Sequence, residues 1–218
     1  MEIDFWQQRW DLDQIAFHLP TVNPYLASFL KDFNINTSSQ IFIPLCGKSL
    51  DITWLASHKF SVLGVECSKK AINELFHEQN IKPQKQTINK FESYQAENIR
   101  ILEGDFFDLD DNLLKEVSLV YDRASLIALP VEMRKKYVNL LNEKLPSSTE
   151  IFLITLEYDQ NSMNGPPFSV SEREVKQLYQ DKYNIEILIE QDVIEGHQKF
   201  AQRGLNKLIE RAYKLSLK

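Results

Sequence analysis

The segment 40–66 constrains the possible fold of this chain more than any other part of its sequence. Ile41 to Ile43 form a short apolar run that is typical of a buried strand. Gly47 follows at a position where the chain can turn sharply and a ligand can approach the backbone. Ser49 is a suitable N-cap for the helical pattern that comes next, and residues 61–65 predict a second strand. This order of strand, glycine turn, helix and strand predicts the first half of a nucleotide-binding α/β unit.

The second strand ends at Glu66, 19 residues after Gly47. In α/β units of this type, an acidic residue about 20 positions past the glycine turn accepts hydrogen bonds from ribose hydroxyls. NAD and FAD are disfavoured, because Gly47 is the only glycine before Gly64 and the G-x-G-x-x-G fingerprint is absent. Gly47-Lys48-Ser49 resembles the end of a phosphate-binding loop, but Phe42 stands where that loop needs glycine. A nucleoside without phosphates fits best, and S-adenosylmethionine is the common one. The alternative is a glycine turn with a purely structural role.

The composition is that of a soluble globular protein, with 43% hydrophobic and 26% charged residues among 218. This length predicts a single domain. The net charge of −6 argues against a nucleic-acid-binding surface. Neither a signal peptide nor an apolar run of about 18 residues is present, so we expect a cytoplasmic protein with no membrane partner. Cys46 and Cys67 are expected to be reduced thiols, and four histidines without a C-x-x-C pair predict no metal site.

Residues 1–35 precede the first predicted strand and are rich in aromatic side chains. Trp6 and Trp10 are four positions apart and share one face of a predicted helix. A second helix is expected to begin at Pro24, which suits a first helical turn. Two interpretations remain open for these aromatics, namely docking of a terminal helix on the core and a lid over the cofactor crevice.

The rest of the chain predicts further strands, at 99–102, 117–121, 151–156, 185–189 and between about 205 and 215. The polar residues 80–98 predict an inserted loop, and Ser171-x-x-Glu174 is a capping box that opens a helix. Asp105 follows the strand 99–102 and is expected to face the crevice. Asp122 and Arg123 stand at the end of the next strand, where α/β enzymes place acceptor chemistry. A structural ion pair is the alternative for these two residues.

Taken together, the chain resembles the thiopurine S-methyltransferase family, especially its bacterial members. The matching stretches are Phe5-Trp6-x-x-Arg9-Trp10, Ile15-x-Phe17-His18, Pro44-Leu45-Cys46-Gly47-Lys48-Ser49-x-Asp51, Gly64-Val65-Glu66, Gly104-Asp105-Phe106-Phe107, Tyr121-Asp122-Arg123-Ala124, Tyr158 and Gly165-Pro166-Pro167-Phe168-Ser169-Val170. The Pro-Leu-Cys-Gly-Lys and Gly-Pro-Pro-Phe elements are the specific ones. The sequence departs from the family pattern at Leu19 and Cys67, and these departures bear on the acceptor more than on the cofactor.

This resemblance implies an α/β fold, the class I S-adenosylmethionine-dependent methyltransferase fold. It is Rossmann-like, with a seven-stranded, mostly parallel sheet whose last strand is antiparallel. The implied organisation is a single domain over 1–218, with an N-terminal helical lid at 1–35 and a Rossmann-like core at 36–218. The residues implied to line the cofactor site are Trp10, Leu45, Gly47, Glu66, Asp105, Phe106 and Arg123. Trp6 and Phe17 would close the site and shape the acceptor side.

The implied activity is S-adenosylmethionine-dependent S-methylation of thiopurines or similar small heterocyclic thiols, with S-adenosylhomocysteine as product. A thiolate is a good nucleophile, so a strong general base is not essential. Arg123 would keep the acceptor ionised, or hold the methionine carboxylate, and Asp122 would orient the acceptor. We expect a monomer whose partner is a small-molecule thiol. The alternatives are selenium, tellurium, thiocyanate or halide acceptors, a nicotinamide-dependent oxidoreductase, and a non-catalytic binder of an adenosyl ligand.

Overall fold

A computed structural model of the chain describes residues 3–15 and 17–218, which divide into two compact units. The first unit extends to Tyr121 and includes Lys144–Pro146. The second comprises Asp122–Glu143 and Ser147–Lys218. Each unit has its own strands and helices and is described by itself.

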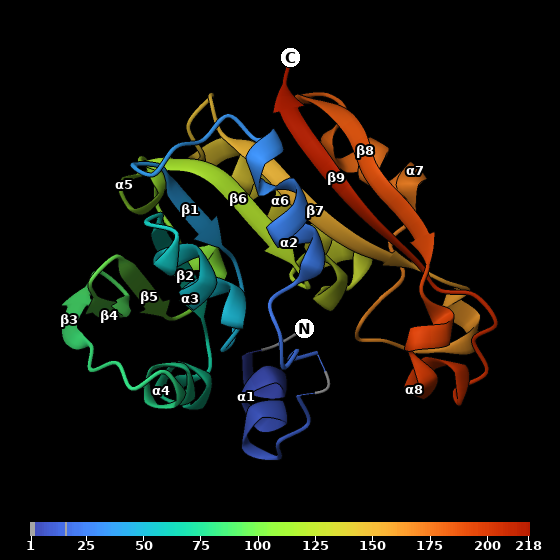
Figure 1. The fold of residues 1–218 in the computed structure, drawn as a ribbon, viewed down its shortest axis with the longest axis horizontal. Coiled ribbons are helices and arrows are strands. Elements are labelled where there is room, and N and C mark those ends of the chain that lie inside the picture. Colours follow the sequence, from blue (N-terminus) through green and yellow to red (C-terminus); the bar gives the residue numbers. More distant parts are fainter. Residues whose placement is uncertain (1–2, 16) are drawn as a thin grey trace. The chain divides into compact units, whose positions relative to one another are not determined.

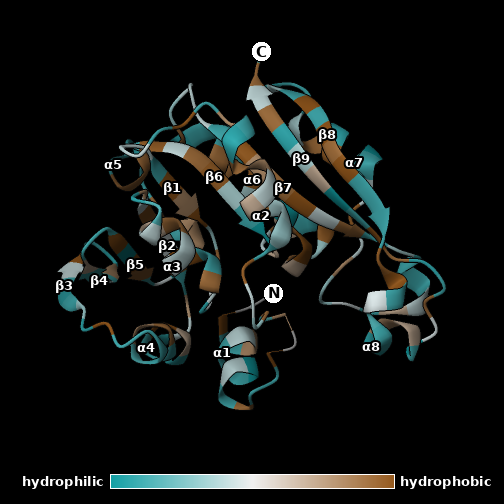
Figure 2. Cartoon of the chain, viewed as in Figure 1, coloured by the Kyte–Doolittle hydropathy of each residue, from teal (hydrophilic) through white to brown (hydrophobic). Residues whose placement is uncertain are grey.

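The first unit contains one run of hydrogen-bonded strands in the order β3-β4-β5-β2-β1-β6. These strands are β1 (Gln40–Ile43), β2 (Ser61–Glu66), β3 (Gln84–Ile88), β4 (Phe91–Ala96), β5 (Ile99–Glu103) and β6 (Val117–Arg123), of which the last two residues belong to the second unit. Strand β1 is parallel to both β2 and β6, and β2 is parallel to β5. Strand β1 is brown in Figure 2 because its residues are mostly apolar, as expected for a strand that is covered on both faces.

Helices of the first unit connect these strands and precede them. They are α1 (Ile3–Asp11), α2 (Pro24–Phe29), α3 (Leu50–Ser57), α4 (Lys69–Glu78) and α5 (Asp111–Leu114), with 3₁₀ turns at Leu30–Asp32 and Phe106–Asp108. Figure 1 shows α1 beside α4, and the two helices are in contact. The predicted cap at Ser49 is confirmed, because its hydroxyl accepts a hydrogen bond from the Asp51 amide. The Ser68 hydroxyl caps α4 in the same way and accepts a hydrogen bond from the Ala71 amide. The predicted N-terminal helices are also confirmed, including Pro24 in the first turn of α2.

The prediction of a loop at 80–98 was wrong, because this region forms the antiparallel strands β3 and β4. Strand β4 in turn pairs with β5 in antiparallel register. Phe91 and Tyr94 of β4 are buried, whereas β3 lies at the edge and is mostly exposed. These strands are additional to the seven that were predicted. Their polar sequences carry no strong alternation, and pairing with β5 supplies the order that local sequence does not.

The second unit contains three strands in the order β7-β9-β8. They are β7 (Glu150–Glu157), β8 (Tyr183–Asp192) and β9 (Ile209–Leu217). Strand β9 is antiparallel to both of its neighbours, so the prediction of an antiparallel last strand is confirmed. The helices are α6 (Val131–Lys144), α7 (Glu172–Tyr179) and α8 (Gln198–Ala201), with 3₁₀ turns at Leu126–Ala128, Gln160–Ser162 and Ile194–Gly196.

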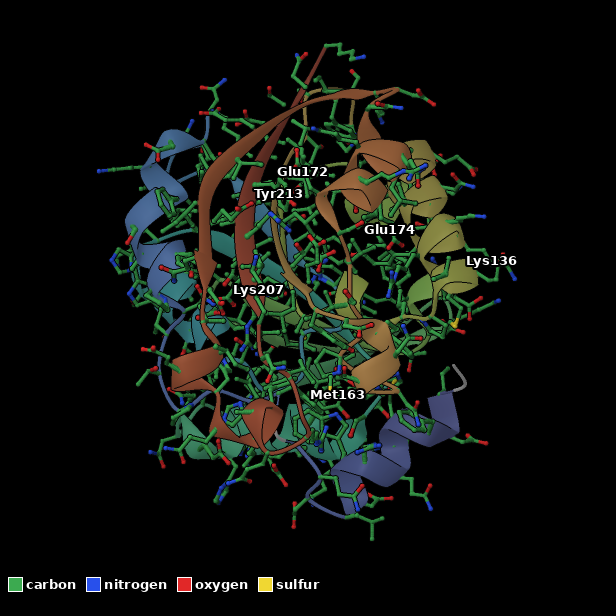
Figure 3. All side chains as sticks on the ribbon, turned by 90° about the vertical axis from the view of Figure 1, so that its right-hand side faces the viewer. Lys136, Met163, Glu172, Glu174, Lys207 and Tyr213 are labelled. Carbon is green, nitrogen blue, oxygen red and sulfur yellow. The ribbon has the colours of Figure 1, made fainter. Side chains whose placement is uncertain are left out.

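A buried arginine joins the helices of the second unit. Arg134 of α6 is 1% exposed, and its guanidinium donates to both carboxylate oxygens of Glu174 at 2.6 and 2.8 Å. Glu174 extends from α7 (Figure 3). The Ser171 hydroxyl accepts a hydrogen bond from the Glu174 amide, as the capping box predicts. In a complete capping box, the Glu174 side chain would also accept a hydrogen bond from the Ser171 amide. Here the Glu174 side chain binds Arg134 instead.

No helix within residues 3–15 and 17–218 is both long enough and apolar enough to cross a lipid bilayer.

Candidate functional site

The turn after β1 is built by two residues with left-handed backbone angles. Leu45 has a φ of 45° and Gly47 a φ of 54°. The amide of Cys46 between them donates to the Val65 carbonyl at 3.0 Å. The Gly47 amide donates to Glu66 Oε2 at 2.8 Å. Backbone and side-chain bonds therefore fix this turn to the end of β2, and the turn and the acidic residue predicted to act together lie in direct contact.

The Glu66 carboxylate is 5% exposed and accepts a second backbone hydrogen bond, from the Ser68 amide to Oε1 at 2.8 Å. Burial raises the pKa of this carboxyl, although the two amides oppose the increase. A carboxylate offers about four lone-pair positions. Three of them are occupied, by the two amides and by the Cys67 thiol, which donates to Oε1 at 3.4 Å. One position therefore remains for a donor such as a ribose hydroxyl, which fits a nucleoside.

Trp10 covers the glycine turn. A Cβ atom added to Gly47 would lie 3.0 Å from Trp10 Cζ2, and Trp10 itself is only 2% exposed. Phe17 makes edge-to-face contacts with Trp10 and Trp6, with ring centroids 5.5 and 5.8 Å apart. Three aromatic residues from the N-terminal segment thus form one cluster next to the turn. Such faces suit a sulfonium cation, because aromatic rings attract cations.

The end of β5 lies beside the end of β2, where the Gly104 amide donates to the Glu66 carbonyl at 3.0 Å. The Asp105 carboxylate then accepts a hydrogen bond from the Phe107 amide at 2.9 Å and caps the following 3₁₀ turn. Phe106 is 3% exposed, and its ring is stacked on Phe42 of β1 with centroids 6.5 Å apart. Asp105 and Phe106 are therefore at the same strand ends as Glu66.

Asp122 and Arg123 end β6, and their surroundings differ. Asp122 is fully buried, and its carboxylate accepts hydrogen bonds from the Ser125 and Leu126 amides, each at 3.1 Å, and from the Tyr137 hydroxyl at 2.7 Å. Burial raises the pKa of the Asp122 carboxyl. Arg123 is half-buried and is followed by Ala124, which has a φ of 77°. Asp122 thus shapes the turn that follows Arg123.

Three polar residues of the first unit were missed as parts of this region. Lys48, in the glycine turn, is buried between Glu74 and Glu78, and Lys70 contacts the end of α1. Their partners are distant in sequence, so no local pattern identifies them. The Cys67 thiol lies 3.4 Å from Glu66 Oε1, and burial raises its pKa. Both cysteines are free, as predicted. Among the described residues, no group of three or more His, Cys, Asp and Glu side chains is arranged to hold a metal ion.

Sequence comparisons connect the chain with one family. A family model described as thiopurine S-methyltransferase matches residues 1–218. The thiopurine S-methyltransferase of Azotobacter vinelandii is 44% identical over 215 residues, with 99% of each chain covered. That of Pseudomonas fluorescens strain SBW25 is 43% identical over 218 residues, with 100% of both chains covered.

Solved structures with a similar fold include methyltransferases of low sequence identity. An S-adenosylmethionine-dependent methyltransferase from Anabaena variabilis has a TM-score of 0.65 at 15% identity and covers 99% of this chain and 95% of its own. One from Thiobacillus denitrificans, in complex with S-adenosyl-L-homocysteine, has a TM-score of 0.62 at 12% identity, with 97% and 98% covered. The predicted class I methyltransferase fold is confirmed.

Proposed function

The chain belongs to the thiopurine S-methyltransferase family and is an S-adenosylmethionine-dependent methyltransferase, and we propose that it methylates the sulfur of thiopurines or similar small heterocyclic thiols. The observation that carries the site assignment is the buried Glu66 carboxylate, which binds the Gly47 amide and keeps a lone pair for one more donor. This arrangement lies under the Trp10 ring, at the carboxyl ends of parallel strands.

In this proposal, the residues that hold the cofactor are Trp10, Leu45, Gly47, Glu66, Asp105, Phe106 and Arg123. Glu66 accepts a hydrogen bond from a ribose hydroxyl. The left-handed turn at Leu45 and Gly47 brings the backbone beside Glu66, and the absence of a side chain at Gly47 leaves room for the Trp10 ring next to the ligand. Phe106, at the end of β5, supplies apolar surface for the adenine.

The cofactor supplies an electrophilic methyl group on a sulfonium sulfur, and the acceptor thiolate supplies the electron pair. Trp6 and Phe17, which meet edge to face, close the site and present aromatic surface to a flat acceptor. Their exclusion of water strengthens the charge interactions inside the site. Sulfur needs no strong base, because a thiolate is nucleophilic once formed. The protein therefore acts mainly by holding and aligning the two reactants.

Arg123 carries the electrostatic role in this proposal. A guanidinium is always charged and offers a planar set of donors, so it suits the methionine carboxylate or an anionic acceptor. It favours the ionised form of an acceptor thiol nearby. Asp122 contributes through the Ser125 and Leu126 amides that it binds, since these fix the backbone just after Arg123.

The proposal also covers the domain organisation, the location and the oligomeric state of the protein. Residues 1–35 form a helical lid on a Rossmann-like core at 36–218, and the two make a single methyltransferase domain. The protein is a cytoplasmic monomer that binds no nucleic acid, which is in keeping with its net charge of −6. Size-exclusion chromatography with light scattering tests the monomer.

Two measurements test the proposed function. Calorimetry with S-adenosylhomocysteine and with NAD⁺ is expected to show binding of the first only, and the reverse result would indicate an oxidoreductase. A competition assay then compares 6-mercaptopurine and thiophenol with selenite, tellurite, thiocyanate and iodide. Preferred methylation of the aromatic thiols supports the proposed acceptor class. Preference for a selenium, tellurium or inorganic acceptor refutes the acceptor class and retains the cofactor. Binding of S-adenosylhomocysteine without turnover of any acceptor would leave a non-catalytic binder.

A further inference from the structure

One side of α4 carries three charged residues at successive turns, Lys70, Glu74 and Glu78. Residues four positions apart lie above one another on a helix, so this series forms a ladder along α4. Figure 1 shows α4 next to α1, and both helices belong to the first unit. The ladder contacts two separate segments, the glycine turn and the end of α1.

Glu74 and Glu78, the second and third residues of this series, bind the glycine turn. Lys48 is 9% exposed, and its ammonium lies 2.9 Å from a Glu74 carboxylate oxygen and 2.7 Å from one of Glu78. The two glutamates thus satisfy a cation that burial alone would disfavour. Because Lys48 follows Gly47 directly, these contacts attach the turn to α4.

Lys70, the first residue of the series, binds the end of α1. Lys70 Nζ donates to the Trp10 carbonyl at 2.8 Å and to Asp13 Oδ1 at 2.6 Å. Lys70 Nζ also lies 3.7 Å from a Glu74 carboxylate oxygen. Because Glu74 binds Lys48 as well, it connects the contacts of Lys70 with those of the glycine turn. A second contact accompanies it, in which Gln7 Nε2 donates to the Cys67 carbonyl at 3.3 Å. The hydrogen bond with Asp13 raises the pKa of Lys70, so the amine stays protonated.

Lys70 occupies a position that its own helix does not favour. It lies in the first turn of α4, where the helix dipole disfavours cations and where no acidic residue is present. Its main-chain partner, Trp10, lies in the last turn of α1, where the dipole favours a cation, and the Trp10 carbonyl also accepts a hydrogen bond from the Asp13 amide at 3.1 Å. The charge of Lys70 is therefore favourable at the end of α1 and unfavourable at the start of α4, and this local conflict points to a role in joining the two helices.

We propose that Lys70 is a positioning residue, which fixes α1 on α4 and thereby holds the Trp10 ring on the Gly47 turn. The backbone of Trp10 is bound by Lys70, and the side chain of Trp10 packs on Gly47, whose neighbour Lys48 is bound by the same helix. The three segments form a closed set of contacts around the proposed cofactor site. The role in cofactor binding rests on the proposed function, whereas the fixing of α1 does not.

The test compares Lys70→Met with Lys69→Met, the exposed lysine beside it on α4. Amide hydrogen exchange is measured across residues 3–15 in the ligand-free protein, and binding of S-adenosylhomocysteine is measured by calorimetry. Lys70→Met is expected to exchange faster in α1 and to bind at least about fivefold more weakly, which is the low end of coupling between linked sites. Lys69→Met is expected to match the wild type in both measurements. Lys70→Arg, which keeps the charge and the donors, should restore most of the binding.

Asp13→Asn tests whether Lys70 acts through Asp13 or through the Trp10 carbonyl. Asp13 is largely exposed, with 73% of its side chain accessible, so its loss is expected to change binding less than twofold. The Trp10 carbonyl is then the partner that matters.

Each outcome decides a separate question. Unchanged exchange of α1 in Lys70→Met overturns the positioning role, whatever the ligand result. Faster exchange with unchanged affinity overturns the link from α1 to the cofactor. A wild-type protein that binds no S-adenosylhomocysteine refutes the proposed cofactor site instead, and the exchange measurement still decides whether Lys70 fixes α1. Similar melting temperatures of the two lysine variants exclude general unfolding as the cause.

Discussion

The backbone amide of Gly47 donates a hydrogen bond to the carboxylate of Glu66 at 2.8 Å. The two residues are 19 positions apart, at the ends of neighbouring parallel strands. This contact lets one side chain hold the glycine turn and still present one lone pair beside it. It makes the shape of the turn and the binding of a ribose depend on the same carboxylate.

Replacing Glu66 by alanine is therefore expected to weaken cofactor binding. Loss of hydrogen bonds to a charged group costs about 1.5–3 kcal/mol, which corresponds to about a 10- to 150-fold increase in Kd. Calorimetry with S-adenosylhomocysteine measures the change, and Glu116→Ala, an exposed carboxylate of the same unit, is the control. A folded Glu66→Ala protein with wild-type affinity would remove Glu66 from the site.

Gly47→Ala tests the glycine turn. A φ of 54° costs a residue with a Cβ about 1–2 kcal/mol, and the new atom would meet Trp10 Cζ2 at 3.0 Å. We expect lower thermal stability, displacement of Trp10 seen as a change in tryptophan fluorescence, and weaker cofactor binding. Gly196→Ala is the matched control, since a Cβ there meets no atom within 4 Å. Equal behaviour of the two variants would show that Trp10 does not constrain the turn.

Arg123→Met separates the two roles proposed for the guanidinium. If Arg123 holds the methionine carboxylate, cofactor affinity falls and the pH–rate profile for a thiol acceptor is unchanged. If Arg123 acts on the acceptor, the rate falls more than the affinity and the apparent pKa of the acceptor rises, because a nearby cation favours the thiolate. Arg123→Lys should restore little where the contact is bidentate. Arg173→Met, on the exposed side of α7, controls for loss of charge. Unchanged binding and turnover in Arg123→Met would contradict both roles.

Asp122 is expected to make stability depend on pH. Burial raises the pKa of its carboxyl above the usual 3.8, so the folded protein binds this proton more tightly than the unfolded chain. The contribution to stability is thus complete below pH of about 4 and decreases as the pH rises through the folded-state pKa. Asp122→Asn removes this dependence. Urea unfolding of both proteins at several pH values measures it, and the stability of the wild type relative to the variant should fall with rising pH. An increase would mean that the folded-state pKa is lowered.

Local sequence patterns were enough to predict the elements that carry the site. The apolar run at Ile41–Ile43, the turn at Gly47 and the cap at Ser49 each depend on near neighbours in the chain, and all three are observed. The spacing from Gly47 to Glu66 follows from the length of one helix, α3, and one strand, β2. Connections of this kind have few alternative geometries, because parallel strands require a crossover of limited length.

Other features depended on pairing over long distances. Residues 80–98 read as a loop, since the exposed β3 has no apolar face and the burial of Phe91 and Tyr94 in β4 depends on β5. The need for glycine at position 64 also depends on a residue that is distant in sequence. A Cβ atom there would lie 2.7 Å from Cys46 Sγ, a contact that depends on how the turn after β1 packs on β2.

The α/β unit, the glycine turn and the acidic residue at the end of β2 were predictable from local sequence, because they follow from backbone preferences and short-range periodicity. The partners of the charged side chains, in contrast, depend on how the helices pack. Lys48 meets Glu78, 30 positions away, and Lys70 meets Asp13, 57 positions away. A lysine has a long flexible side chain and no local preference for a partner, so the packing of α1 and of the glycine turn against α4 selects it.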